Sequence, residues 1–254
     1  MIGVSQVSEA EAGTQPRTGR ALLAIRELIL EGGLAPGDRV SELSVAEHTG
    51  ISRTPIRAAL QRLEEEGLVE AIPSGGYAVR SFSERDVFDA IEIRGTLEGL
   101  AARFAAERGA SPARLEPLND CVGELDELVP DQLATEEGFA RYVAANKRLH
   151  ALILELAESP SLVRQMERAV ALPFASPSAF IMAQSNIPES RQLLVVAQDQ
   201  HRCVVEAIAN HEGARAQAIM QEHARLAARN LRLALKSEAA LERIPGGSLI
   251  RTRR

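Results

Sequence analysis

A change in the spacing of apolar residues near residue 80 most restricts how this chain of 254 residues can fold. Before it, short apolar segments are separated by glycines and prolines. After it, long segments carry apolar residues at every third or fourth position, the period of amphipathic helices. No alternation of strands and helices accompanies that period. The sequence therefore predicts a mainly α protein, in which a small N-terminal domain is followed by an all-α helical bundle.

The first part, residues 17–82, predicts three helices followed by a hairpin. The helices are expected over residues 19–31, 41–47 and 52–66, and the strands over residues 68–71 and 77–80. Ser52 is a favourable N-cap for the third helix, and Pro55 stands in its first turn, where the missing N–H costs little. Gly75 and Gly76 lie in the loop that joins the strands. This order of elements predicts a winged helix-turn-helix.

The second part, residues 83–237, predicts helix almost throughout. Helices are expected over residues 84–107, 112–128, 135–157, 160–172, 189–209 and 213–236. Breaks are expected at Gly109, at Pro130, at Ser159 and in the stretch 173–188, which is rich in Pro and Ser. The flanking residues, 1–16 and 238–254, are expected to be a disordered tail and a flexible tail.

Composition excludes several classes of protein. Hydrophobic residues make up 45% of the chain and charged residues 25%, which is enough for a packed core. No apolar run approaches the roughly 18 residues of a membrane helix, and residues 1–16 lack the basic start and apolar stretch of a signal peptide. Cys121 and Cys203 lie far apart and form no CxxC pair. We therefore expect a cytoplasmic protein without a membrane partner.

The net charge of −6 differs from the basic balance usual in proteins that bind nucleic acids. Residues 1–80 carry eight arginines and eleven acidic residues, so the N-terminal part is not basic overall. Residues 52–62, however, contain Arg53, Arg57 and Arg62 and no acidic residue. A helix with such a local positive charge can face phosphates even in an acidic protein.

The start of the third helix has the residue types of a DNA recognition helix. Such a helix enters the major groove at its N-terminus, with hydroxyls near phosphates and guanidinium groups near base edges. Ser52 and Thr54 supply the hydroxyls, and Arg53 and Arg57 stand four residues apart on one face. The alternative is an ordinary solvated helix face, which the proline, the caps, the hairpin and the local charge disfavour.

The N-terminal part resembles the GntR family of bacterial transcription regulators over residues 18–82. The similar stretches are Leu34–Val40, Ser41–Leu43, Gly50–Arg57 and Leu63–Val69. The resemblance implies that Arg53 and Arg57 contact DNA, that Ser52 and Thr54 assist at phosphates, and that Gly75 and Gly76 reach the minor groove. Many members place an arginine early in the second helix, where this chain has Leu43 and Ser44, so the resemblance does not imply the phosphate or base contact of that arginine here.

Three predicted helices of the bundle each direct one histidine toward their apolar side. These are His150, with Asn146 four residues before it, His201 and His223; His211 falls in a predicted turn. A single inward histidine is usually a hydrogen-bonded core residue, but three neutral imidazoles in one bundle need partners. A divalent metal ion supplies them, since three histidines with an open position suit Zn²⁺ and imidazole also suits Ni²⁺.

Arg94 shares the inner side of helix 84–107 with Glu98 and with apolar residues. An inward guanidinium group is costly unless it is paired. Two interpretations stay open. Either Glu98 is its local partner, or Arg94 and the metal ion together bind the carboxylate of a small ligand.

The second part resembles the FCD ligand-binding domain that accompanies one branch of GntR regulators. The similar pieces are Arg94 with Leu97–Glu98, Asn146–His150, Leu156–Ser159, His201 with Ala207–Ile208, and Ala216 with His223. The resemblance implies a site of one Asp and three His, which correspond here to Asn146, His150, His201 and His223. It also implies a divalent ion, Zn²⁺ first with Ni²⁺ or Mn²⁺ as alternatives, and small organic acids as effectors. The amide of Asn146 is a weaker ligand than a carboxylate.

Phe174 and Phe180 have two interpretations: they line a pocket for an aromatic acid, or they fill the core, and the second is favoured. Taken together, the sequence predicts a transcription repressor that binds a palindromic operator as a homodimer and responds to a small carboxylic acid at the metal ion and Arg94. One alternative is a metal enzyme with Glu98 as base, although no HExxH, GxSxG or P-loop occurs. Another is a regulator with a purely structural metal ion.

Overall fold

The structure, a computed structural model, describes residues 17–131, 135–179, 188–236, 238–241 and 244–251. The predicted disordered tail, residues 1–16, lies outside this range. The chain divides into two compact units, Met1–Ser81 and Phe82–Arg254. It is mainly helical, with a helix-turn-helix unit followed by a helical unit, so the predicted fold class is confirmed. In the described ranges, none of the helices combines the length and the apolar character that a membrane span requires.

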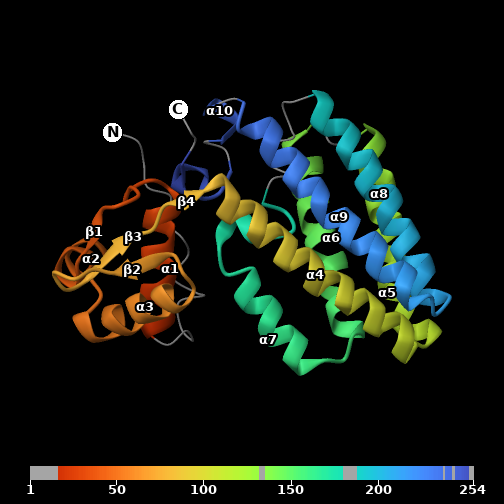
Figure 1. The fold of residues 1–254 in the computed structure, drawn as a ribbon, viewed down its shortest axis with the longest axis horizontal. Coiled ribbons are helices and arrows are strands. Elements are labelled where there is room, and N and C mark those ends of the chain that lie inside the picture. Colours follow the sequence, from red (N-terminus) through yellow and green to blue (C-terminus); the bar gives the residue numbers. More distant parts are fainter. Residues whose placement is uncertain (1–16, 132–134, 180–187, 237, 242–243, 252–254) are drawn as a thin grey trace. The chain divides into compact units, whose positions relative to one another are not determined.

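The first unit is a winged helix-turn-helix (Figure 1). Its helices are α1 (Arg17–Leu30), α2 (Glu42–Thr49) and α3 (Arg53–Glu65), and its strands are β1 (Arg39–Val40), β2 (Val69–Ala71) and β3 (Tyr77–Val79). The strands form an antiparallel sheet in the order β1-β3-β2. The sequence predicted β2 and β3 but missed β1, because two residues show no periodicity.

The core of this unit fixes which side of α3 remains outside. Ile25 and Ile29 of α1 are fully buried, as are Ile56, Leu60 and Leu63 of α3. Since these α3 positions follow the helical period, the opposite side of the helix is left to solvent. The packing of α1 on α3 therefore determines the exposed surface discussed below.

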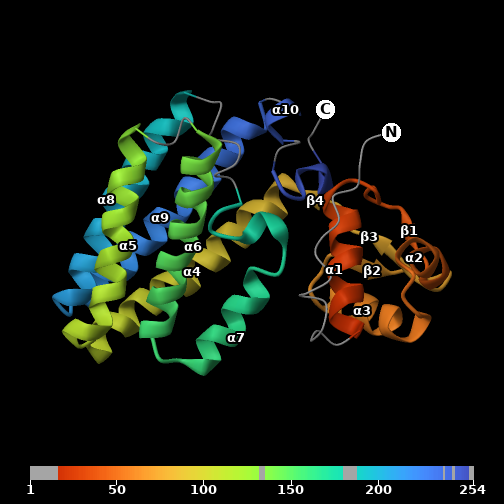
Figure 2. The ribbon, with the colours of Figure 1, turned by 180° about the vertical axis from the view of Figure 1, so that it is seen from behind.

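The second unit is a bundle of long helices that closely follow the predicted spans (Figures 1 and 2). They are α4 (Glu84–Arg108), α5 (Pro112–Asp131), α6 (Glu136–Leu156), α7 (Pro160–Ala169), α8 (Pro188–Ala209) and α9 (Gly213–Ala234). Helix α7 ends three residues earlier than predicted, ahead of Pro173, which opens a 3-10 turn. Helix α5 continues through Pro130, where the sequence predicted a break.

Helices α4 and α9 approach each other closely because glycines of α4 stand at their contact. A Cβ atom on Gly95 would lie 2.5 Å from the Cβ atom of Ala224, and one on Gly99 would lie 2.8 Å from Cγ of Gln221. At Gly95 a larger residue would require a backbone to move, and at Gly99 it would displace the side chain of Gln221 and press on the carbonyl oxygen of Gln217, 3.0 Å away. The contact brings the inner side of α4, with Arg94 and Glu98, next to the inner side of α9.

The end of the chain corrects one prediction. In place of a flexible tail over residues 238–254, α10 (Glu238–Leu241) is followed by a 3-10 turn and by β5 (Ile250–Arg251). Strand β5 pairs in parallel with β4 (Phe82–Ser83). Ile244, Leu249 and Ile250 are buried, with at most 5% of their surface exposed. Their burial outweighs the glycines and terminal arginines that suggested a loose end.

Candidate DNA-binding face and metal site

The first turns of α3 present the predicted polar residues to solvent. Ser52, Arg53, Thr54 and Arg57 are all exposed, whereas Pro55 is buried. Ser52 has the extended backbone of an N-cap, but its side chain makes no capping hydrogen bond, so the hydroxyl is available to another acceptor or donor. With the wing residues Gly75 and Gly76, these four residues are called the DNA-binding face below.

Glu42, at the start of α2, pairs with both arginines of this face. Its carboxylate accepts a hydrogen bond from Nε of Arg57 at 2.6 Å and one from Nη2 of Arg53 at 3.2 Å. Hydrogen bonds from Arg57, and then from Arg53, lower the pKa of Glu42 despite the opposing effect of burial. Glu42 thus holds two exposed guanidinium groups side by side, and the sequence analysis did not single it out.

The wing is shaped by two left-handed residues and one long side chain. Gly75 and Gly76 have backbone φ angles of +82° and +92°, which residues other than glycine rarely adopt. Nη2 of Arg39 donates to the carbonyl oxygen of Gly75 at 2.8 Å, which ties the loop to β1.

Leu43 of α2 is 59% exposed. The sequence analysis noted that many members of the family that this part resembles have an arginine near this position.

The three predicted histidines of the bundle meet in space. His150 comes from α6, His201 from α8 and His223 from α9, and one nitrogen of each lies within 4.8 Å of the others. Nε2 of His201 is 3.2 Å from Nε2 of His223. All three rings are buried, with at most 9% of each residue exposed. These residues are called the histidine cluster below.

The electrostatics of the cluster favour neutral rings at His201 and His223. Burial lowers the pKa of His201 well below its ordinary value, and the neighbouring His223 and His150 lower it further. Burial, followed by the neighbouring His150, lowers the pKa of His223 to about 3. A neutral imidazole has the free electron pair that a metal ion requires.

The donor set fits a divalent cation. Nε2 of His150 is buried and has no hydrogen-bond partner among the described residues, and the Nε2 atoms of His201 and His223 face each other at 3.2 Å. Nitrogen ligands at about 2.0–2.1 Å from a tetrahedral Zn²⁺ lie about 3.3–3.4 Å apart. Rings whose ligand atoms are up to 4.8 Å apart would therefore move inward by more than about 1 Å when an ion binds. Among the described His, Cys, Asp and Glu residues, this is the group with metal-ligand spacing.

Asn146, the fourth predicted ligand, lies one turn before His150 on α6. It is 2% exposed, and its Nδ2 donates to Oγ of Ser178 at 3.3 Å. Because Nδ2 is engaged, the amide oxygen is the atom that can serve as ligand. Asn146 lines the same pocket as His150 and His223.

Arg94 is connected to the cluster through Glu98. Nε of Arg94 lies 3.4 Å from one carboxylate oxygen of Glu98, and the other oxygen is 2.8 Å from Nδ1 of His150. Burial opposes the ionisation of Glu98, but Arg94 and His150 outweigh it and lower its pKa to about 2. Glu98 is therefore the local partner of Arg94 that the sequence analysis left open.

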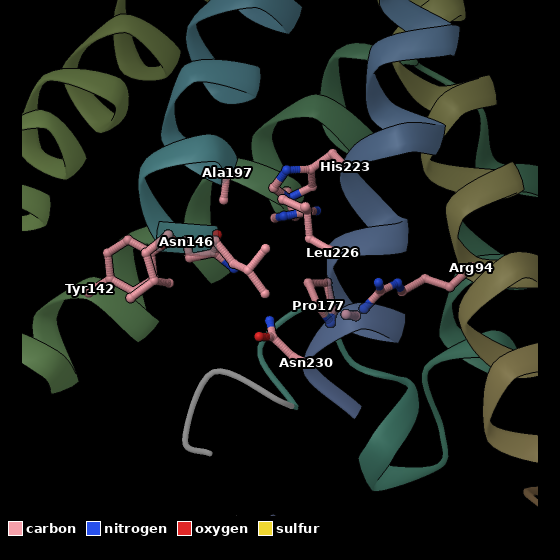
Figure 3. Close-up of a pocket in the computed structure, with 12 residues that line it drawn as sticks. Arg94, Tyr142, Asn146, Pro177, Ala197, His223, Leu226 and Asn230 are labelled. Atoms are coloured by element: carbon pink, nitrogen blue, oxygen red, sulfur yellow. The ribbon is translucent and has the colours of Figure 1, made fainter. Parts of the chain in front are cut away.

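A pocket lies beside the cluster (Figure 3). Its cavity volume is about 30 Å³, and Arg94, Asn146, His150 and His223 are part of its wall. This pocket is called the central pocket below. A cavity of this volume holds little more than one water molecule, so an organic ligand would require its walls to move apart. Asn230 adds a further polar group, because its Oδ1 is buried and has no hydrogen-bond partner among the described residues.

Phe174 fills the core and is not among the residues that line the central pocket. It is fully buried and packs edge-on against Phe82, with ring centroids 4.8 Å apart. This position agrees with the favoured interpretation of the aromatic pair. Phe180, the other member, lies outside the described residues.

Comparison with known families assigns both parts of the chain. The gntR family of bacterial regulatory proteins matches residues 18–79, and the FCD domain matches residues 89–226. The match to the FCD domain alone covers more than half of the chain. This protein belongs to the GntR family. The family resemblance inferred from the sequence is therefore confirmed, and the protein is a DNA-binding transcription regulator.

Individual relatives agree with this assignment. A protein of Paenarthrobacter nicotinovorans, named "Probable D-xylose utilization operon transcriptional repressor", is 33% identical over 181 residues, which span 71% of this chain and 73% of that protein. The repressor GlaR of Escherichia coli is 25% identical over 197 residues, which span 77% of this chain and 86% of GlaR. These relatives are transcription regulators and not enzymes, so the enzyme alternative is set aside.

A solved structure shows the same fold. The structure of McbR/YncC of E. coli superposes with a TM-score of 0.57 and 19% identity, and the match covers 86% of this chain and 100% of that chain.

Two contributors to the site were missed by the sequence analysis, and each had a weak signal. Gln198, whose Oε1 lies 3.0 Å from Nδ1 of His201, is three residues before that histidine on the same side of α8, and Asn230 is two turns after His223 on α9. Their phase is visible in the sequence, but an inward amide is common in helical cores and has no ligand spacing of its own. Glu42 had no such signal, because only the fold places the start of α2 beside α3.

Proposed function

We propose that this GntR regulator is a repressor whose affinity for its operator is controlled by a small carboxylic acid bound beside a divalent metal ion. The observation that carries the proposal is the meeting of His150, His201 and His223 beside a pocket that Arg94 also lines. A buried ring nitrogen without a hydrogen-bond partner is unfavourable, and a metal ion bound to the three rings would supply that partner. The relatives whose names describe them as repressors support the proposal that this protein represses transcription.

The ligands of the ion would be the three histidines and the amide oxygen of Asn146. Zn²⁺ is the first choice, because three histidines with an open position are typical of zinc sites, and Ni²⁺ and Mn²⁺ are the alternatives. When bound, the ion supplies Lewis-acid ligation for one oxygen of a carboxylate. An amide brings no negative charge, so the charge of the acid contributes more to this site than it would beside an aspartate.

The acid would lie in the central pocket, whose walls would move apart to admit it. Arg94 is 2% exposed, and its contacts are long: Nε lies 3.4 Å from a carboxylate oxygen of Glu98, and Nη1 and Nη2 donate to the carbonyl oxygens of Ala175 and Ala224 at 3.4 Å each. A second carboxylate near Arg94 is therefore favoured. Asn230 offers a hydrogen-bonding group on another part of the wall. The mixture of apolar and polar wall residues suits small organic anions, and aromatic acids belong to this class.

The DNA-binding face would bind each half of a palindromic operator through a homodimer. Arg53 and Arg57 would contact base edges, Ser52 and Thr54 would contact phosphates, and the wing at Gly75 and Gly76 would lie at the minor groove. Two recognition helices in a symmetric dimer meet half-sites about one helical turn apart. The acid would act by binding more tightly to a state with low affinity for DNA.

The test combines DNA binding with metal loading. An operator is first selected from random duplexes, and its affinity is then measured by fluorescence anisotropy with benzoate, citrate and lactate as probes. We expect at least one acid to weaken operator binding by about 5- to 150-fold in the Zn²⁺-loaded protein and to have no effect after chelation. Tight Zn²⁺ binding together with operator binding that no acid changes would overturn the effector role and leave a structural metal ion.

A matched pair of variants locates the acid. Asn230→Ala removes a polar group from the wall of the central pocket, and Asn210→Ala makes the same change at an exposed position. The first variant should bind the operator normally but lose most of its response to the acid, and the second should respond as the parent protein does. Equal responses in the two variants would place the acid elsewhere.

A further inference from the structure

We propose that Gln198 and Glu98 are positioning residues that fix the tautomers of His201 and His150 in advance, so that His223 is the one ring of the cluster that changes tautomer when a metal ion binds. This inference rests on the proposed metal site. It assigns roles to two residues that do not themselves contact the ion. It also distinguishes three histidines that otherwise look equivalent.

The orientation of the Gln198 amide can be derived from its partners. Gln198 is 1% exposed, and its amide nitrogen lies 3.1 Å from the carbonyl oxygen of Val122 and 2.5 Å from Oδ1 of Asp126. A carbonyl oxygen and a carboxylate can only accept here, so the NH₂ group must face them. The carboxylate of Asp126 is held in turn by Nη2 of Arg202 at 2.6 Å.

This orientation determines where His201 carries its proton. With the NH₂ group directed at Asp126, Oε1 of Gln198 faces Nδ1 of His201 at 3.0 Å. An amide oxygen accepts only, so Nδ1 of His201 donates and is protonated. Because the ring is neutral, Nε2 of His201 then presents a free electron pair toward the centre of the cluster.

Glu98 has the same effect on His150. Its Oε1 lies 2.8 Å from Nδ1 of His150, and an ionised carboxylate accepts only. Nδ1 of His150 therefore donates, and Nε2 keeps its electron pair. That Nε2 atom is buried and has no hydrogen-bond partner among the described residues, as expected of a ligand atom. Carboxylates and carbonyl groups that orient metal-binding histidines in this way are a common feature of metal sites.

His223 lacks such a partner in the described part of the chain. Its Nδ1 is buried without a hydrogen bond, and its Nε2 lies 3.2 Å from Nε2 of His201. Since Nε2 of His201 can only accept, the proton between them belongs to Nε2 of His223. For Nε2 of His223 to bind a metal ion, this proton must leave and another must be taken up at Nδ1. The ring is neutral before and after, so the net charge does not change.

Nuclear magnetic resonance of the full chain with ¹⁵N-labelled histidine tests this inference directly. In the metal-free protein, long-range ¹H–¹⁵N spectra should show the proton on Nδ1 for His150 and His201 and on Nε2 for His223. After one equivalent of Zn²⁺, the first two should keep their tautomers and His223 should show Nδ1–H. A proton on Nε2 of His150 or His201 without metal, or an unchanged tautomer at His223 with metal, would overturn the inference.

A matched pair of variants tests the role of Gln198 in affinity. Gln198→Met removes the acceptor of His201 at similar volume, and Gln192→Met makes the same change at an exposed position of α8. Calorimetric titration with Zn²⁺ should show a loss of about 10- to 100-fold for the first and none for the second. The spectra of Gln198→Met should also show both tautomers of His201. Equal affinity in the two variants, or a single Nδ1–H tautomer in Gln198→Met, would overturn the positioning role.

Failure of this inference is distinguishable from failure of the proposed function. If the parent protein binds no Zn²⁺, the proposed metal site is wrong. The tautomers of the metal-free protein test the roles of Gln198 and Glu98 independently of that result. If Gln198→Met does not fold, the spectra of the parent protein still decide the matter.

Discussion

The DNA-binding face and the histidine cluster hold their polar side chains in opposite ways. The side chains of Arg53 and Arg57 are 65% and 63% exposed and share the carboxylate of Glu42. The rings of the cluster are buried, and two of them are oriented by Glu98 and Gln198. Ion pairs in water are weak and easily exchanged, whereas a buried polar group that loses its partner costs about 1–3 kcal/mol.

This difference has a functional meaning. A face that binds DNA must exchange its internal partners for phosphates and base edges, and exposed arginines can do so at little cost. A metal site gains from rings that already point in the required directions. Substitutions at the first site should therefore change DNA binding and leave the fold intact. Substitutions at the second should change ligand binding and stability together.

The largest effect is expected from removing a ring of the cluster. His201→Ala takes away one of the four proposed ligands; because the loss of a group that only orients a ligand costs about 10- to 100-fold, Zn²⁺ affinity should fall by at least about 100-fold. Calorimetric titration of metal-stripped protein measures this change. His211→Ala, which replaces an exposed histidine outside the cluster, should bind Zn²⁺ like the parent protein. Similar loss in both variants would count against the cluster as the site.

The second effect is a dependence of stability on pH in the metal-free protein. The pKa of His223 is lowered to about 3 from the ordinary 6.5, so the unfolded chain binds a proton at a higher pH than the folded protein does. Stability should therefore be fully present above pH 6.5 and decline as the pH falls toward 3. The loss is up to about 1.4 kcal/mol per pH unit for such a group. His150 and Arg94 oppose protonation of His223, and Glu98 favours it.

Thermal unfolding between pH 7 and 4 measures this dependence, with His223→Asn as the comparison because carboxylates also titrate at the lower end. The variant should show a shallower decline than the parent protein. Parallel curves would show that the burial of His223 contributes nothing to the acid sensitivity.

The third effect concerns the DNA-binding face. Arg53→Ala should weaken operator binding by about 5- to 150-fold, which corresponds to about 1–3 kcal/mol for a lost base contact. Arg62→Ala, at an exposed position later in the same helix, is the control and should have little effect. Anisotropy titrations measure both, and thermal unfolding should show no change in either. Normal operator binding by Arg53→Ala would refute the assignment of this face.

The smallest effect is expected at Glu42. Glu42→Gln removes the negative charge that holds Arg53 and Arg57, so affinity for unrelated DNA should rise a few-fold, and the preference for the operator should fall. Titrations with operator and random duplexes at several salt concentrations measure the two changes. Glu47→Gln, at an exposed position of the same helix, controls for the change in charge. An unchanged preference would mean that Glu42 has no part in orienting the arginines.

The sequence predicted the fold well because helical periodicity extends over whole elements. The long helices carry apolar residues in phase for many turns, and Ser52 with Pro55 marks the start of α3. Short elements were harder. Strands β1 and β5 have two residues each. Strand β5 forms by pairing with β4, which lies far away in the sequence. Pairing of this kind has no local signal.

The site was predicted in part for the same reason. The phase of His150, His201 and His223 on their helices could be derived from spacing, and so could that of Arg94. The partners that orient these side chains could be predicted only in part: Glu98 was a candidate for Arg94, but its contact with His150 and that of Gln198 with Asp126 join different helices and form only in the folded bundle. The sequence thus supplies the direction of a side chain, and the fold supplies the groups around it.

Anomalous X-ray diffraction from crystals loaded with Zn²⁺ tests the central claim most directly, because it locates the ion. The account predicts one anomalous peak per chain, about 2.0–2.1 Å from a nitrogen of each of His150, His201 and His223. Density for the protein without a peak among these three rings, at full Zn²⁺ loading in solution, would contradict it.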